Sequence, residues 1–308
     1  MFEIRQETFG SFEKIILKSA TREVAFVPAF GANILSLQFQ GKEILWGFEN
    51  EEQLIVNDKS RNILLAPFPN RVQAGCYFFE GNHYQLPITK PKENNAIHGF
   101  VWNKKFELVS KEITSDFSSA TLRYIYDGSE AGYPFPFELT LLYTLYKNSF
   151  NLNFSVENTG NSNMPFGFGW HPYFSFGNNI EEWQLQLPKC NMLQTNEQLI
   201  PNGERRNFSA FQNPEKIGDT TFDTAFELNG KENFFETRLF SSVQNEILSV
   251  KQSRTFKYLQ VYIPPQRNSI AIEPMTCPAN AFNSGEGLII LSPQKSSSGS
   301  ISVTLLNC

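Results

Sequence analysis

The stretch FELTLLYTLY, residues 137–146, decides the fold class of this chain. Its apolar side chains recur at every second position: Leu139, Leu141, Tyr143 and Leu145. Because successive side chains of a strand point to opposite faces, this period of two predicts a half-buried β-strand. The stretch FNLNFSVE, residues 150–157, alternates in the same way, and the tripeptide KNS between the two predicts a hairpin turn.

The same alternation spreads outward from this hairpin and predicts an all-β fold of large, mostly antiparallel sheets. Further predicted strands lie at 13–17, 23–27, 34–39, 121–126, 259–263 and 301–305. Amphipathic patterns with a period of 3.6 are absent, although a short helical turn fits residues 51–57. The Ser-rich stretch 296–300 is low in complexity and predicts a loop before the final strand.

Size and charge narrow the class of protein. A chain of 308 residues with 41% hydrophobic content can bury a substantial core, and without a linker we expect one domain over residues 1–308. The formal net charge is -5, and neither sign gathers into a long block. A nucleic-acid partner is therefore not expected. The sequence does not indicate an oligomeric state beyond a monomer or a weak dimer.

The first residues, the length of the apolar runs and the cysteines indicate the cellular compartment in which the protein is expected to act. Residues 1–7 carry acidic side chains and no apolar core, so they lack the layout of a secretory signal. No apolar run approaches the roughly 20 residues that cross a bilayer, so we expect no membrane partner. Cys76, Cys190, Cys277 and Cys308 lack the close spacing of a zinc site, and buried thiols in a reducing cytoplasm are the simpler interpretation.

Two of the three histidines lie in apolar segments, where a polar side chain is uncommon. His98 and His171 each end an apolar stretch and precede Gly or Pro, whereas His83 falls in a predicted hairpin, where a solvated histidine is expected. Either of the first two could be a hydrogen-bonded structural residue, because a neutral imidazole packs well once it is satisfied. Equally, either could serve a rigid site.

Charged residues in apolar segments add further candidates. Glu273 ends a predicted buried strand, where a carboxylate is costly unless it is paired or functional. Arg71 lies in a Pro-rich apolar segment, and the structural alternative for both residues is an ion pair with each other. Asp223, between aromatic residues, could accept hydrogen bonds from a ligand or organise a turn, and Asp219 is a nearby competitor.

At this point the sequence resembles the aldose 1-epimerase, or galactose mutarotase, family. The resemblance rests on five motifs in the family's order, from Phe9 to the C-terminus: NRV at 70–72 with its hairpin, IHGF at 97–100, HPYF at 171–174, FDTAF at 222–226 and IEPMTCPANAFN at 272–283. The compact segment 100–104 resembles the shorter bacterial branch, and Pro293-Gln294-Lys295 replaces the family's usual Pro-Gly-Glu turn. The resemblance implies a two-sheet supersandwich with an open sugar cleft and no metal or organic cofactor.

The resemblance also implies roles in the interconversion of sugar anomers. Glu273 is then the catalytic base and His171 the acid, while Arg71, His98, Asn70 and Asp223 bind the small-molecule aldose. With ordinary pKa values of about 4.3 and 6.5, Glu is ionised at neutral pH and His can supply a proton. Partial burial would raise the pKa of the Glu and make it a better base.

Several other functions use the same residues. One alternative is a non-catalytic carbohydrate-binding protein, and another is a hexose-6-phosphate mutarotase, with Arg205, Arg206 and Arg267 as phosphate ligands. A glycoside hydrolase would pair Asp223 with Glu273. A metal hydrolase would use His98, His171 and Glu273, although no short His spacing recommends it.

Overall fold

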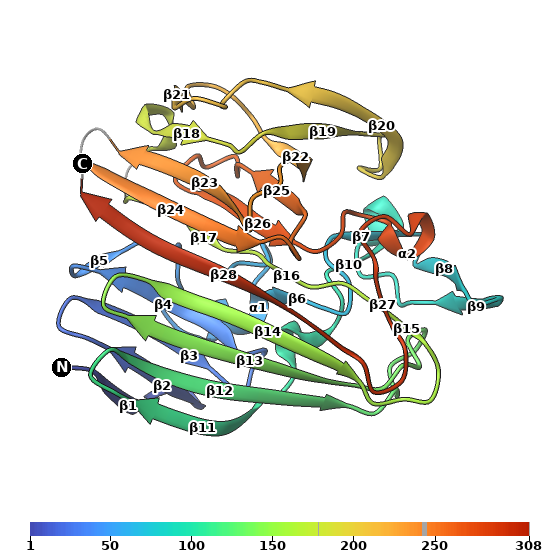
Figure 1. The fold of residues 1–308 in the computed structure, drawn as a ribbon, viewed down its shortest axis with the longest axis horizontal. Helices are drawn as coiled ribbons and strands as arrows, with labels where there is room; N and C mark the ends of the chain where they lie inside the picture. Colours follow the sequence, from blue (N-terminus) through green and yellow to red (C-terminus); the bar gives the residue numbers. More distant parts are fainter. Residues whose placement is uncertain (178, 242–244, 308) are drawn as a thin grey trace.

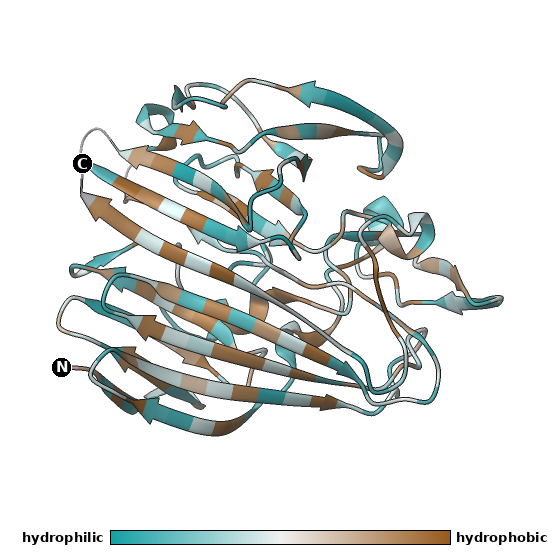
Figure 2. Ribbon diagram, in the orientation of Figure 1, coloured by the Kyte–Doolittle hydropathy of each residue, from teal (hydrophilic) through white to brown (hydrophobic). Residues whose placement is uncertain are grey.

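The central hairpin forms as the alternating pattern predicts. The computed structural model describes residues 1–177, 179–241 and 245–307. In it β13 (Phe137–Tyr146) turns directly into the antiparallel β14 (Phe150–Asn158), with Leu145 opposite Phe150. The apolar side chains of β13 at 139, 141, 143 and 145 are fully buried. Figure 2 shows this alternation of hydrophobic and polar positions along the long strands.

This hairpin belongs to the largest sheet (Figure 1), in which nine of the described strands pair antiparallel. Their order is β11 (Glu107–Ile113), β12 (Phe117–Tyr126), β13, β14, β28 (Ser296–Asn307), β24 (Glu246–Ser253), β23 (Phe234–Ser241), β18 (Gln184–Gln186) and β21 (Glu215–Lys216). The C-terminal strand β28 therefore lies in the middle of the sheet, between β14 and β24.

Two further sheets lie behind the largest sheet (Figure 1). The first has the order β1 (Glu3–Phe9), β2 (Phe12–Lys18), β3 (Arg22–Val27), β4 (Asn33–Phe39) and β5 (Lys42–Glu43). The second has the order β20 (Pro201–Phe208), β19 (Cys190–Thr195), β22 (Asp223–Leu228), β25 (Tyr258–Tyr262), β26 (Ile270–Met275), β16 (Gly169–Trp170) and β6 (Leu64–Leu65). In this second sheet β17 (Tyr173–Phe174) also pairs with β26.

The core lies between these layers and consists largely of aromatic and branched aliphatic side chains. Phe26 of β3 meets Tyr143 of β13 edge-on, with ring centroids 5.0 Å apart. Phe154 of β14 stacks on Phe168, near β16, at 4.2 Å. Such contacts bury a continuous apolar cluster between the nine-stranded sheet and both sheets behind it. The predicted all-β supersandwich is confirmed.

One prediction about the fold is wrong, because the Ser-rich stretch 296–300 is the first part of β28 and not a loop. Its backbone pairs with β14, with Ser298 opposite Ser155 and Gly299 opposite Phe154. Backbone hydrogen bonds in a ladder do not depend on the side chain. The small residues also have a packing reason, since a Cβ on Gly299 would lie 2.8 Å from both Phe154 and Phe256.

The remaining elements are short. The helices are α1 (Glu51–Val56), within the predicted helical turn, and α2 (Ala281–Ser284), with 3₁₀ turns at Pro91–Glu93, Val101–Asn103 and Ile180–Glu182. Two-stranded pairs form between β7 (Arg71–Gln73) and β10 (Asn95–Ile97), β8 (Cys76–Phe79) and β9 (Asn82–Gln85), and β15 (Met164–Phe166) and β27 (Ile289–Leu291).

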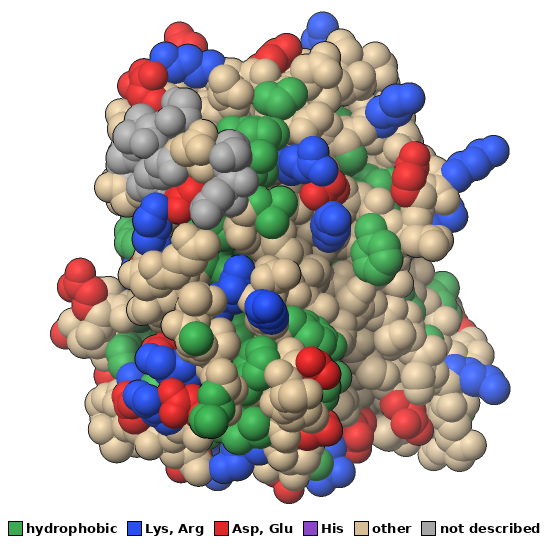
Figure 3. Space-filling view, turned by 60° about the vertical axis from the view of Figure 1, so that its left-hand side comes forward, with side chains coloured by type: hydrophobic (Ala, Val, Ile, Leu, Met, Phe, Trp, Pro, Cys, Tyr) green, Lys and Arg blue, Asp and Glu red, His purple; other side chains and the backbone are tan. Residues whose placement is uncertain are grey.

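The surface charges and the cysteines are distributed largely as the sequence predicts. On the face shown in Figure 3, basic side chains lie among acidic ones, so neither sign forms a block there. No helix among the described residues is long and apolar enough to span a bilayer. Cys190 and Cys277 are buried free thiols, whereas the free thiol Cys76 is only half-buried, and Cys308 lies outside the described residues.

Candidate active site

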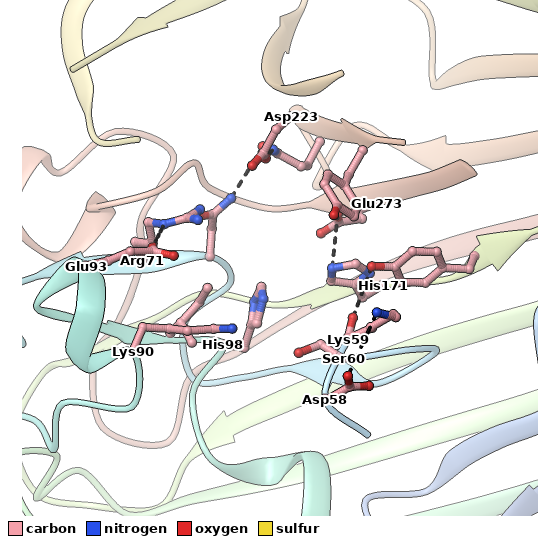
Figure 4. Close-up of a pocket in the computed structure, with 15 residues that line it drawn as sticks. Asp58, Lys59, Ser60, Arg71, Lys90, Glu93, His98, His171, Asp223 and Glu273 are labelled. Atoms are coloured by element: carbon pink, nitrogen blue, oxygen red, sulfur yellow. Dashed lines mark hydrogen bonds and ion pairs between the residues drawn. The ribbon is translucent and has the colours of Figure 1, made fainter. Parts of the chain in front are cut away.

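One cavity collects the candidate residues from across the sequence. It has a volume of about 340 Å³ and lies against β22, β25 and β26 of the eight-stranded sheet (Figure 4). Segments that are distant in the sequence complete its wall, including the loop at 58–60 and the pair β7 and β10. All six predicted site residues line it: Asn70, Arg71, His98, His171, Asp223 and Glu273.

Strand register places the carboxylates of the cavity. Glu273 lies on β26 directly opposite Gln260 of β25, and Tyr262 on the same strand lies opposite Asp223 of β22. Because side chains alternate along a strand, Gln260 and Tyr262 point to one face. The amide of Gln260 donates to Oδ1 of Asp223 at 2.7 Å. Glu273 is only 2% exposed, whereas Asp223 is an exposed residue at the first position of β22.

His171 faces Glu273 from a break between two strands. It follows β16, and Pro172 separates it from β17. Nε2 of His171 lies 3.3 Å from Oε1 of Glu273, and both side chains are buried (Figure 4). The ring of Tyr173 stacks on the His171 imidazole with centroids 5.0 Å apart. A possible proton donor and a carboxylate thus meet in the cavity wall.

Arg71 is buried, as both sequence interpretations required, but it does not form the ion pair with Glu273 that was the structural alternative. Nε of Arg71 instead donates to Glu93 at 2.8 Å, and Nη1 donates to Oδ1 of Asn70 at 3.0 Å. The amide of Asn70 in turn donates to Gln260 at 3.3 Å. Glu93, the ion-pair partner of Arg71, lies in a short 3₁₀ turn that no sequence pattern predicts. Glu273 instead contacts the imidazole of His171.

His98 reaches the cavity through an unusual backbone conformation. It follows β10, has a φ of 64°, and its amide donates to the carbonyl of Asn70 at 2.8 Å. Gly99 comes next with a φ of 67°, and a Cβ there would lie 2.0 Å from the carbonyl oxygen of Ala66. Only glycine fits this close approach without strain. The imidazole of His98 meets that of His171 edge-on at 5.4 Å.

Burial sets the protonation of the central pair. It raises the pKa of Glu273 well above its ordinary value, and the nearby Asp223 carboxylate raises it further, although Arg71 acts in the opposite direction. Burial lowers the pKa of His171 to about 3. Burial, with contributions from His171 and Arg71, also holds the pKa of His98 well below its usual range. Burial therefore favours the uncharged form of all three groups.

Three buried polar atoms of the site have no hydrogen-bond partner among the described residues. They are Nδ1 of His98, Nδ1 of His171 and Oε2 of Glu273. Burying such atoms without partners costs free energy. All three belong to residues that line one cavity, although other atoms of this kind, such as Oδ1 of Asn33, lie elsewhere in the protein.

Other residues weighed in the sequence lie elsewhere. His83 is exposed on β9, and Asp219 is exposed and does not line the cavity. The predicted phosphate ligands also fall outside its lining: Arg205 pairs with Glu227 at 2.6 Å, Arg267 lies 3.2 Å from Glu181, and Arg206 is exposed on β20. Within the described ranges, no three His, Cys, Asp or Glu side chains are arranged to hold a metal ion.

Part of the cavity wall consists of residues that the sequence does not mark as site residues. Gln260 and Tyr262 fall in a predicted strand, and a polar residue in that apolar run was a usable signal. Tyr173 lay within a quoted motif without an assigned role. The others come from loops that carried no pattern: Asp58, Lys59, Ser60, Lys90 and Glu93.

A fold of large antiparallel sheets packed in this way is the fold of galactose mutarotase-like proteins. A galactose mutarotase-like protein from Clostridium acetobutylicum shares it, with a TM-score of 0.92 at 22% identity, covering 100% of this chain and 99% of that one. The sequence model of the aldose 1-epimerase family matches residues 13–304. The chain belongs to the aldose 1-epimerase family.

Individual relatives agree with this assignment. The uncharacterised Escherichia coli protein YihR is 30% identical over 278 residues, which cover 88% of this chain and 86% of YihR. Human galactose mutarotase is 24% identical over 262 residues, covering 78% of this chain and 75% of the human protein. Membership of this family supports a mutarotase-like isomerase that acts on a sugar.

Proposed function

We propose that this protein is an aldose mutarotase that interconverts the α and β anomers of a free hexose of the galactose or glucose type. The observation that carries the proposal is the contact between His171 and Glu273, at 3.3 Å, in the wall of a polar cavity. Anomer exchange requires one group that accepts a proton and another that donates one. This pair has both chemistries within reach of one sugar ring.

The reaction needs only proton transfers and one bond rotation. Glu273 takes the proton from the C1 hydroxyl while His171 protonates the ring oxygen O5, and the C1–O5 bond breaks to give the open-chain aldehyde. Rotation about the C1–C2 bond presents the other aldehyde face to the O5 hydroxyl. Ring closure then returns the O5 proton to His171 and the Glu273 proton to O1, so the pair is regenerated.

In the unliganded pair of His171 and Glu273, the shared proton lies on the carboxyl group, whereas ordinary pKa values would place it on the imidazole. Because burial raises the pKa of Glu273 and lowers that of His171, the proton of the pair resides on Glu273. That distribution is the one reached when the sugar is open. Moving this proton to His171 gives the state that begins ring opening, without changing the net charge of the pair.

The remaining cavity residues fit roles in holding hydroxyl groups. Arg71 and His98 lie to the left of Glu273 and His171 in the cavity as drawn in Figure 4, and we propose that they bind oxygens near C1 and O5. Asp223 lies at the exposed start of β22 and is proposed to bind a more distant hydroxyl, with Asn70 orienting Arg71.

We further propose that residues 1–308 form a single domain that needs no cofactor. Given its free thiols, we propose that it works in the reducing cytoplasm.

Polarimetry of freshly dissolved α-glucose and α-galactose tests the proposed function. We expect the protein to accelerate the approach to anomeric equilibrium for at least one of the two sugars, in proportion to its concentration. Calorimetric titration with each equilibrated sugar distinguishes the alternatives. Binding without faster relaxation would identify a non-catalytic carbohydrate-binding protein, and acceleration restricted to glucose 6-phosphate would identify a sugar-phosphate mutarotase.

A further inference from the structure

The backbone that carries His171 has a break in its pairing with β26. β16 pairs with β26 only at Gly169 and β17 resumes that pairing at Tyr173, whereas β16 stays paired with β6 through Trp170 and the amide of His171 donates to the carbonyl of Ile63 at 3.0 Å. Pro172 between them has no amide hydrogen to donate. The position of a side chain placed on such a break depends on contacts from outside the ladder.

Asn62, which lies on the loop before β6, is the residue whose side chain adds contacts to this segment beyond the backbone hydrogen bonds, which include that from the amide of His171 to the carbonyl of Ile63 at 3.0 Å. The backbone amide of Asn62 donates to the carbonyl of His171 at 2.9 Å, and its backbone carbonyl accepts from Nε1 of Trp170 at 3.2 Å. Its side-chain Oδ1 accepts from the amide of Tyr173 at 3.1 Å. Asn62 therefore holds the residues on both sides of His171 as well as His171 itself.

The side chain of Asn62 also ties this segment to the neighbouring chain. Its Nδ2 donates to the carbonyl of Trp46 at 3.1 Å, while the amide of Trp46 donates to the carbonyl of Tyr173 at 2.7 Å. Both polar ends of the Asn62 amide are thus satisfied in the interior, where the residue is 1% exposed. Satisfied buried networks of this kind fix one arrangement of the groups that they join.

The residue type suits the backbone. Asn62 has a φ of 59°, in the left-handed region that asparagine tolerates better than most residues with a Cβ. Glycine would tolerate this conformation too, but it would leave the Tyr173 amide and the Trp46 carbonyl without these partners. Asn62 does not line the cavity, so it touches no substrate placed there.

We propose that Asn62 is the positioning residue of the site, and that its side chain fixes the 170–173 segment so that Nε2 of His171 meets Oε1 of Glu273. The expected effect on the reaction rate rests on the proposed mutarotase function. The expected effect on the position of the His171 ring does not depend on that function. A displacement of about 1 Å in a catalytic group can cost on the order of 100-fold in rate.

The test compares Asn62→Gly with Asn158→Gly. Asn62→Gly keeps the left-handed backbone accessible and removes both side-chain hydrogen bonds. Asn158 is a matched control: it is also 1% exposed, and its amide donates to the carbonyls of Ser162 and Leu291, which do not line the cavity. We expect Asn62→Gly to lower kcat about 10- to 100-fold with KM unchanged, and Asn158→Gly to lower the unfolding temperature with kcat unchanged.

Imidazole resonances in ¹H–¹⁵N spectra give a readout that does not depend on activity. The chain has three histidines, and His171→Gln assigns the signal of interest. We expect that signal to move in Asn62→Gly and to stay in place in Asn158→Gly. An unmoved signal, a wild-type kcat, or an equal loss of kcat in both variants would overturn the proposal.

A second variant guards against a failure of Asn62→Gly to fold. Asn62→Asp keeps an oxygen for the Tyr173 amide but turns a second oxygen toward the carbonyl of Trp46 in place of the Nδ2 donor, so we expect kcat to fall and the His171 signal to move. An unchanged signal and kcat in this variant would also overturn the proposal. If the wild-type protein does not accelerate anomerisation, the proposed function fails, and the spectra alone still decide whether Asn62 places His171.

Discussion

Nε2 of His171 lies 3.3 Å from Oε1 of Glu273, and both side chains are shielded from solvent. Burial favours the uncharged form of each group, so it moves their pKa values in opposite directions: upward for the carboxyl and downward for the imidazole. A proton shared by the pair is therefore held more strongly by the carboxyl than by the imidazole. Titration of such a pair belongs to both groups together.

Replacing Glu273 with Gln should abolish most catalysis. The amide preserves the shape of the side chain but cannot accept the C1 hydroxyl proton, so we expect the rate of anomerisation to fall by about 10² to 10⁴. Polarimetry with the better of glucose and galactose measures this fall. Turnover near that of the wild type would show that Glu273 is not the base.

Glu246→Gln is the matched control for that substitution. Glu246 on β24 is 2% exposed, like Glu273, and pairs with Lys42 at 2.5 Å, but it does not line the cavity. We expect this variant to keep the wild-type rate while losing some stability through its broken ion pair. A similar loss of rate in both variants would trace the effect of Glu273→Gln to stability instead of chemistry.

Glu273→Gln should also stabilise the fold at neutral pH. In the unfolded chain the carboxyl has a pKa of about 4.3, below the raised pKa of the native state. Between these values only the native state holds the proton, so the free energy of unfolding falls as the pH rises. The variant escapes this penalty, and we expect it to be more stable than the wild type at pH 7, by an amount that vanishes as the pH falls below 4.

Thermal unfolding across this pH range measures the effect. The wild type and Glu273→Gln should unfold at nearly the same temperature at pH 4, and the variant should unfold at the higher temperature at pH 7. A variant that is less stable at pH 7 would mean that the native carboxylate is stabilised by its surroundings, contrary to the direction given by burial.

The fold could be predicted where each strand has one buried face. Alternation identified β13 and β14 because their inner positions meet the core while the outer ones do not. It failed for the first part of β28, where Ser and Gly pair with β14 under the aromatic rings of Phe154 and Phe256. Small residues carry no period, so packing against large neighbours was invisible in the sequence.

The site could be predicted from residues that stand out in an apolar setting. Glu273, His171 and His98 do so, and all three line the cavity. Their partners could not be predicted, because register places Gln260 opposite Glu273 and a loop brings Glu93 to Arg71. Those relationships are set by tertiary structure, and neither residue is marked by its own neighbours in the chain.

Gly99→Ala should destabilise the protein more than Gly41→Ala. Both glycines have a positive φ, 67° and 75°, so an alanine at either place carries the cost of a left-handed backbone. A Cβ at Gly41 meets nothing within 4 Å, whereas one at Gly99 meets the carbonyl of Ala66. We expect Gly99→Ala to cost about 1–3 kcal/mol more, measured by denaturant unfolding. An equal loss of stability in the two variants would show that the loop carrying His98 can shift to accommodate a Cβ at position 99.

The pH dependence of kcat/KM should show no titration of His171 between pH 7 and pH 5. The lowered pKa of His171, about 3, keeps its imidazole neutral between pH 7 and pH 5, where a solvated histidine with a pKa of about 6.5 would become charged. We therefore expect no fall in kcat/KM from the protonation of His171 in this range. Polarimetric rates, corrected at each pH for spontaneous anomerisation, measure this profile. A fall in kcat/KM with a midpoint near pH 6.5 would show that His171 titrates as a solvated residue, and that its burial does not control the proton of the pair.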